Sequence, residues 1–255
     1  MGRIITIANQ KGGVGKTTTA INLSACLAEA GQHVMLVDFD PQGNASSGLG
    51  VEIEEHEHTV YDLMAEEAGL DECLVKNVQD NLDVLPSDMN LAGAEIEFQE
   101  IENKETLLKR YLDQVRDDYD FILIDCPPSL NILTINALTA ADTVLVPIQC
   151  EYYALEGLNQ VLKTVELVRK KLNPQLELEG VVFTMYDART NLSTQVVENV
   201  KNNLDTTIYQ TIIPRNIRLA EAPSHGLPIT LYDSKSAGAE SYRDLAREVI
   251  NRKDV

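Results

Sequence analysis

The chain has 255 residues, 44% of them hydrophobic and 24% charged, a balance typical of an ordinary soluble globular protein. No apolar run approaches the roughly 20 residues that a membrane-spanning helix needs, so an integral membrane protein is not expected. The four cysteines stand far apart and form no CxxC pair, which predicts reduced thiols and a cytosolic protein.

The formal net charge is −19, and it is unevenly distributed along the chain. Residues 51–120 contain 5 Lys or Arg against 21 Asp or Glu, whereas residues 163–218 contain 8 against 6. A wholly acidic surface repels nucleic acid, but this sequence keeps a mildly basic region apart from the acidic one. We expect the acidic stretch to form a solvated surface.

Strand-like apolar runs alternate with helix-length amphipathic segments from one end of the chain to the other. The runs are rich in Ile and Val and nearly continuous, which indicates strands covered on both faces. They span 3–8, 33–38, 82–87, 120–125, 143–148 and 178–185, and helices are expected at 17–30, 103–116, 153–172 and 192–204. The pattern predicts an α/β protein with a mostly parallel, twisted sheet flanked by helices on both faces, as one domain over 1–255.

Ligands of such sheets bind at the carboxyl ends of strands, and the first strand is followed there by "NQKGGVGKTTT". A strand, a glycine-rich turn and a helix N-terminus form an anion trap, which predicts a P-loop NTPase that uses ATP and Mg²⁺. Lys16 is expected to neutralise the β- and γ-phosphates, and Thr17 to give Mg²⁺ a hydroxyl ligand. The predicted phosphate-loop residues are Lys11, Gly12, Gly13, Val14, Gly15, Lys16, Thr17 and Thr18.

Two further strands end in carboxylates. "LVDFDPQGN" places Asp38 and Asp40 at a strand end, on a shared face if the strand continues that far. One of the two is expected to orient the attacking water and the other to support the magnesium shell. "FILIDCPPS" ends its apolar run at Asp125, which can hold Mg²⁺ through water. The predicted metal-site residues are Thr17, Asp40 and Asp125.

The phosphate loop departs from the general G-x-x-x-x-G-K-[ST] pattern, because Gln10 replaces its first glycine and Lys11 stands beside it. "KGGVGKTT" instead resembles the deviant Walker A motif of the ParA/MinD group of ATPases. Other segments, such as "DFDPQGNASSGLG" and "IPRNIRLAEAPSHGLPI", resemble the short chromosomal ParA proteins, also called Soj. The resemblance covers nearly the whole chain and weakens at 51–80 and at the extreme C-terminus.

The resemblance assigns roles to the charged residues of the loop. In this group the first lysine reaches across an ATP sandwich dimer to the partner's phosphates, so Lys11 is expected to act in trans and Lys16 in cis. The second aspartate of the group's motif is tied to hydrolysis, which makes Asp40 the expected catalytic carboxylate. The predicted catalytic residues are therefore Lys11, Lys16 and Asp40.

The resemblance also implies that the ATP-bound homodimer binds double-stranded DNA without sequence preference. Arg189 and Arg218 match positions that the family uses for DNA, with Lys201 and Arg215 as helpers, and all four lie in the mildly basic region. A dimer doubles the phosphate contacts, on which affinity depends steeply. For the nucleotide, Pro214 and Asn216 are the expected adenine contacts, with Met185 opposite, and Glu151 is expected to touch the partner's nucleotide.

The function predicted is that of a chromosome-partitioning ATPase in the bacterial cytoplasm and on the nucleoid. Its slow hydrolysis is expected to be activated by dimerisation, DNA and a ParB-type centromere-binding partner. No membrane partner is expected, because the last helix, "SYRDLAREVI", is followed only by "NRKDV", and Leu245, Ala246, Val249 and Ile250 are expected in the core. The alternatives are a MinD-like membrane-cycling ATPase and a non-enzymatic nucleotide-gated regulator, with a metabolic P-loop ligase or synthetase less favoured.

Overall fold

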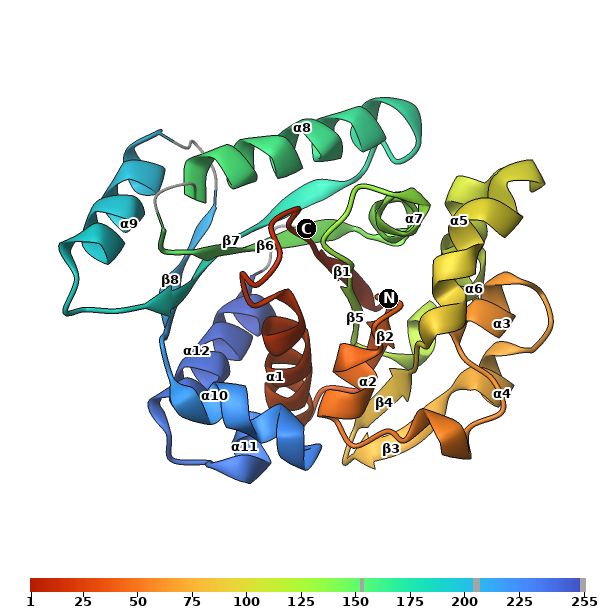
Figure 1. Cartoon of the computed structure of the whole chain (residues 1–255), viewed down its shortest axis with the longest axis horizontal. Helices are drawn as coiled ribbons and strands as arrows, with labels where there is room; N and C mark the ends of the chain where they lie inside the picture. The colour runs from red at the N-terminus through yellow and green to blue at the C-terminus, as the bar shows by residue number, and fades with distance from the viewer. Residues whose placement is uncertain (152–153, 204–206, 253–255) are drawn as a thin grey trace.

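A computed structural model describes residues 1–151, 154–203 and 207–252 of the chain (Figure 1). Within this part, eight strands form one sheet in the order β3-β4-β2-β5-β1-β6-β7-β8. Only the β3–β4 pair is antiparallel among these strands. The strands are β1 (Arg3–Ile7), β2 (Val34–Asp38), β3 (Val75–Gln79), β4 (Leu82–Leu85), β5 (Phe121–Asp125), β6 (Thr143–Gln149), β7 (Glu177–Tyr186) and β8 (Ile208–Pro214).

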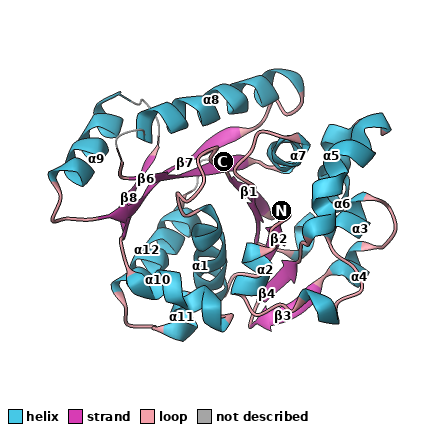
Figure 2. Cartoon of the chain, in the orientation of Figure 1, coloured by secondary structure: helices cyan, strands magenta, loops and turns pink. Residues whose placement is uncertain are grey.

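Helices cover both faces of the sheet, as Figure 2 shows. They are α1 (Lys16–Glu29), α2 (Asn44–Gly48), α3 (Val60–Met64), α4 (Leu70–Cys73), α5 (Ala94–Glu97), α6 (Leu107–Val115), α7 (Ile132–Ala140), α8 (Ala154–Lys171), α9 (Asn191–Asn203), α10 (Ile217–Glu221), α11 (Ile229–Tyr232) and α12 (Ala237–Asn251). Successive side chains of a strand point to opposite faces, so β1 supplies both cores. Ile4 packs in the core with α6, α7 and α8, whereas Ile5 and Ile7 pack in the core with α1 and α12.

The predicted fold class is confirmed, and the boundaries differ by a few residues. Lys104–Thr106 form a 3₁₀ turn, so the helix predicted from 103 begins at Leu107. The last helix begins earlier than "SYRDLAREVI", because the Ser236 hydroxyl accepts the N–H of Ala239 and caps it there. Positions 153, 204 and 253–255 of the predicted segments lie outside the described residues.

Two strands were not predicted. β3 is a short edge strand with a largely polar sequence, "VKNVQ", and it is joined to β4 through Asn81, whose φ is +64°. β8, with the sequence "IYQTIIP", lies at the opposite edge of the sheet. Both strands are paired on one side only, so neither carries the continuous apolar run of a central strand.

The C-terminal helix packs as predicted. Leu245, Ala246 and Val249 are buried in the core that also contains α1, and Ile250 packs against it. In the described part of the chain, no helix combines the length and the apolarity that crossing a bilayer requires.

Candidate nucleotide and DNA sites

The phosphate loop connects β1 to α1 at the carboxyl edge of the sheet (Figure 1). Gly13 and Gly15 have φ values of +71° and +88°, a conformation that side-chain-bearing residues rarely adopt. Asn9 fixes the start of the loop, since its amide donates to the Pro147 carbonyl at 2.8 Å and its Oδ1 accepts the Lys11 N–H at 3.0 Å. The Thr184 hydroxyl fixes the middle by donating to the Val14 carbonyl at 2.8 Å.

Lys16 begins α1 and is only 6% exposed. Its Nζ donates to the Lys11 carbonyl at 3.4 Å. Burial lowers the pKa of Lys16, and the charges of Asp125 and Asp40 partly oppose that shift. A buried ammonium at a helix N-terminus gains most from an anion, so this position suits a nucleotide phosphate.

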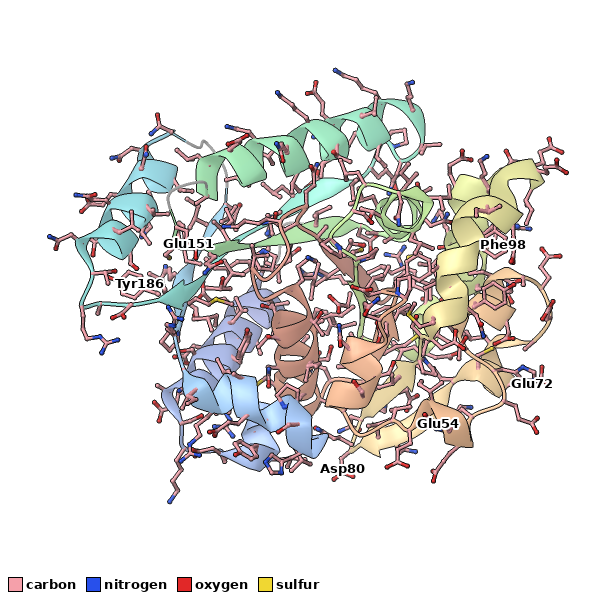
Figure 3. The ribbon with its side chains drawn as sticks, in the orientation of Figure 1. Glu54, Glu72, Asp80, Phe98, Glu151 and Tyr186 are labelled. Atoms are coloured by element: carbon pink, nitrogen blue, oxygen red, sulfur yellow. The ribbon has the colours of Figure 1, made fainter. Side chains whose placement is uncertain are left out.

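Lys11 points to a different partner from Lys16. Its Nζ lies 2.7 Å from Oε2 of Glu151, which follows β6 and is labelled in Figure 3. The two side chains are 37% and 48% exposed. Exposed ion pairs contribute about 0–1 kcal/mol, so Lys11 can leave this partner at little cost.

Asp38 and Asp125 stand opposite each other in the register of β2 and β5. Both carboxylate oxygens of Asp125 are buried and have no hydrogen-bond partner in the described part of the chain. Burial and then the charge of Asp38 raise the pKa of Asp125 well above its ordinary value, while the nearby Thr17 hydroxyl and Lys16 favour its charged form. Buried carboxylate oxygens beside the Thr17 hydroxyl are the observation here that best fits a bound cation.

The donors around Asp125 fit Mg²⁺. This ion prefers one or two carboxylates together with water and substrate phosphates over a cage of protein ligands. The described residues contain no group of three or more His, Cys, Asp and Glu that could hold a metal by themselves. Thr17, in the first turn of α1, supplies a hydroxyl beside the phosphate loop.

Asp38 is engaged in a different way from Asp125. Its Oδ2 accepts the N–H and the hydroxyl of Ser46 at 2.7 and 2.8 Å, and its Oδ1 accepts the N–H of Asp40 at 3.3 Å. Burial raises the pKa of Asp38 to about 6, and the bonds from Ser46 oppose that rise. Asp38 therefore joins α2 to the backbone of Asp40 through both of its oxygens.

Asp40 does not share a strand face with Asp38, because β2 ends at Asp38. It lies in the turn that follows, is 7% exposed, and accepts the Gln42 N–H at 3.0 Å. Gly43 closes that turn with a φ of +62°, and a Cβ there would meet the Ser87 carbonyl oxygen at 2.8 Å. The turn that contains Asp40 therefore cannot accept a residue larger than glycine at position 43.

A cavity of about 560 Å³ opens beside the phosphate loop. Its lining brings together the three predicted adenine contacts, Met185, Pro214 and Asn216, with Gly15 and Thr18 of the loop. Arg215, predicted for DNA, also lines this cavity, and the sequence did not indicate the six remaining lining residues: Thr184, Ile213, Ile217, Leu219, Ala220 and Tyr242. Tyr242 comes from α12, far away in the chain, and its hydroxyl lies 3.1 Å from that of Thr19, so only the tertiary fold shows its place.

Of the four predicted DNA-binding residues, Arg189 follows β7, and Arg215 and Arg218 follow β8. The Arg189 guanidinium makes two hydrogen bonds to Asp187, at 2.9 and 2.7 Å, and Arg218 pairs with Glu221 at 2.9 Å. The Arg215 N–H donates to the carbonyl of Tyr186 (Figure 3), which joins the segments after β7 and β8. Lys201 is exposed near the C-terminal end of α9.

A family model and several known proteins match most of the chain or nearly all of it. A family model described as an AAA domain matches residues 2–178, a range that contains the phosphate loop and all three carboxylates. The chain is 59% identical over 249 residues to the sporulation initiation inhibitor protein Soj of Bacillus subtilis, covering 98% of each chain. It is 52% identical to the chromosome partitioning protein ParA of Caulobacter vibrioides, covering 98% of this chain and 94% of that one.

A solved structure is also similar over almost the full length. It is that of cobyrinic acid a,c-diamide synthase from Mycobacterium smegmatis with a bound ATP analogue and magnesium. The TM-score is 0.86 at 37% sequence identity, and the match covers 98% of this chain and 95% of that one.

Proposed function

Because the chain belongs to the ParA/Soj family of chromosome-partitioning ATPases, we propose that it hydrolyses ATP with Mg²⁺ as a sandwich dimer bound to DNA. In this cycle an ADP-bound or free monomer alternates with an ATP-bound dimer on the nucleoid, in the bacterial cytoplasm. A ParB-type centromere-binding protein stimulates hydrolysis and so releases the dimer from DNA.

The phosphate loop supports the first half of this proposal. Its amides and Lys16 bind the phosphates in cis, and the adjoining cavity, with Met185, Pro214 and Asn216, receives the base. Asp125 and Thr17 hold Mg²⁺, which neutralises charge that develops on the transferring phosphoryl group. Asp40, in the turn after β2, orients the attacking water toward the γ-phosphate.

The position of Lys11 is the observation that supports hydrolysis by a dimer. Its ammonium is held by Glu151 and not by its own phosphate loop, through an exposed pair that exchanges easily. A partner's phosphates compete for that cation when two loops meet face to face, and Glu151 is then free to contact the partner's nucleotide. Hydrolysis becomes conditional on dimerisation, because each site has both of its cations only when it holds Lys16 from its own protomer and receives Lys11 from the partner.

The loops next to the base cavity support the DNA-binding part of this proposal. The segment after Met185 carries Arg189, and the segment around Asn216 carries Arg215 and Arg218. The walls of the base cavity therefore continue into the cationic loops. A monomer offers few phosphate contacts, and a dimer doubles them, so binding is steeply favoured by ATP.

The experiment that tests this function measures binding to a DNA duplex of arbitrary sequence, with ADP and with ATP–Mg²⁺, at low and moderate salt. We expect binding only with ATP, and weaker binding as salt increases. Binding under neither nucleotide, together with ATP-dependent co-sedimentation with liposomes, would favour the membrane-cycling alternative. ATP turnover that stays negligible with DNA and the partner present would favour a non-enzymatic regulator.

The name of the Mycobacterium smegmatis structure raises the less favoured alternative, a metabolic synthase. Identity is higher to the partitioning proteins, at 59% and 52% against 37%. Lys11 also has no use in an enzyme that works as a monomer. ATP turnover that is independent of protein concentration and of DNA would reverse this preference.

A further inference from the structure

The turn that carries Asp40 is linked through Asp38 to a buried serine, Ser46. Ser46, in α2, is fully buried, and both its N–H and its hydroxyl donate to Oδ2 of Asp38, at 2.7 and 2.8 Å. The other oxygen of Asp38 accepts the N–H of Asp40 at 3.3 Å. Asp38 thus joins the backbone of Asp40 to Ser46 without any exposed group in the chain of contacts.

The same serine also connects the turn to a third segment. Its hydroxyl oxygen accepts the N–H of Ser87, just after β4, at 3.2 Å. The end of β2, the start of α2 and the segment after β4 therefore meet at one hydroxyl. Gly43 closes the turn against the same segment, since it lies directly on the Ser87 carbonyl.

We propose that Ser46 is a positioning residue for ATP hydrolysis, acting through Asp38 to fix the backbone that carries Asp40. The inference rests on the proposed function, in which Asp40 orients the attacking water. A displacement of about 1 Å at such a group can cost up to about 100-fold in rate. ATP binding depends on a different segment, the phosphate loop, and should not change when Ser46 loses its hydroxyl.

The chain offers a matched control on the same helix. Ser47 is the next residue and is exposed, and its hydroxyl lies 3.5 Å from the Asn44 carbonyl, remote from the bonds to Asp38. Ser46→Ala and Ser47→Ala therefore remove the same atom from neighbouring positions. We would measure kcat and KM for ATP–Mg²⁺ with DNA present, together with the ATP-dependent dimer fraction.

Ser46→Ala is expected to lower kcat about tenfold with KM and the dimer fraction unchanged, and Ser47→Ala to leave all three unchanged. In the Asp40→Ala background, followed by single turnover of radiolabelled ATP, Ser46→Ala should cause little further loss, because both changes act on one group. Ser46→Cys keeps a weak donor on a slightly larger side chain, and its kcat should fall between the wild type and Ser46→Ala.

Wild-type kcat in Ser46→Ala would overturn the inference while leaving the proposed function intact, provided that Asp40→Ala is inactive. A parallel loss of ATP binding and turnover in both Ser46→Ala and Ser46→Cys would also overturn it, because Ser46 would then only support the fold. A full additional loss in the Asp40→Ala background would contradict action through Asp40. An inactive wild type would defeat the proposed function itself.

Discussion

Charged side chains at the carboxyl edge of the sheet are buried in one region and exposed in another. We call the region around β1, β2 and β5 the buried end and the region around β7 and β8 the exposed end. Around β1, β2 and β5, the groups Lys16, Asp38 and Asp125 are each less than a tenth exposed. Around β7 and β8, the Arg189 side chain is 87% exposed and that of Arg218 is 50% exposed, and each lies against a carboxylate of its own chain.

The difference suggests two uses of charge within one molecule. Buried charges are costly to place and hard to move, so they suit chemistry that needs a fixed geometry before the substrate arrives. Exposed ion pairs are worth little and are readily exchanged, so they suit binding that must be switched on and off. Lys11 lies at the buried end, but it is 37% exposed and its pair with Glu151 is of the exposed, readily exchanged kind.

The largest effect is expected at the buried end. Asp40→Ala should lower ATP turnover on the order of 100-fold, because the attacking water loses its orienting carboxylate. ATP binding should persist, and the DNA-bound dimer should accumulate, as measured by DNA retention after a chase with unlabelled ATP. Normal turnover in this variant would remove the role given to Asp40.

Gly12→Val tests whether the buried end is completed by a second protomer. Among the described residues, a Cβ at Gly12 would have only Pro128 Cβ within 4 Å, at 4.0 Å, so the variant should fold and bind ATP normally. Crowding where two loops meet should weaken the dimer roughly 30-fold, the effect of about 2 kcal/mol of overpacking. Analytical ultracentrifugation with a non-hydrolysable ATP analogue measures this, and a dimer of normal stability would refute the crowding argument.

Arg189→Glu tests the exposed end, and DNA affinity should fall about tenfold or more, with a shallower salt dependence. Arg247→Glu is the matched control. It makes the same charge change on α12 beside Ile208, at the opposite end of β8. Equal losses in the two variants would mean that net charge, and not a surface at the β7–β8 end, governs DNA binding.

The smallest effect should come from releasing Arg189. Asp187→Asn removes the carboxylate that holds it, and DNA affinity in ATP should rise about two- to fivefold, the range expected from an exposed pair. Asp244→Asn, which frees Arg247 from its pair at 2.6 Å, removes one negative charge elsewhere and serves as control. An increase of the same size in both variants would show that Asp187 does not compete with DNA.

The buried end could be anticipated from the sequence because its parts are local. A strand followed by a glycine-rich turn and a helix places Lys16 and Thr17 within one short segment. Asp125 can be found locally too, because it directly ends a continuous apolar run. The tertiary partners could not be anticipated, since Thr184 contacts the loop, Tyr242 contacts Thr19 of α1 and Ser46 contacts Asp38 through strand register and helix packing.

The sequence also did not predict the strands at the two edges of the sheet. β8 was not predicted, and with it the wall of the base cavity that includes Ile213. The ion pairs of Arg189 and Arg218 are local enough to be read from "DAR" and "RLAE", yet nothing in those letters distinguishes a DNA contact from an ordinary surface pair.

The most direct test of the account is to mix two inactive variants, Lys11→Ala and Asp40→Ala, and measure ATP hydrolysis with DNA present. In a mixed dimer, the site of the Lys11→Ala protomer keeps its own Asp40 and receives Lys11 from its partner. Random pairing makes half of the dimers mixed, with one complete site of two, so turnover should recover to about a quarter of the wild-type rate. A mixture no more active than the two variants alone would show that Lys11 does not act across the dimer.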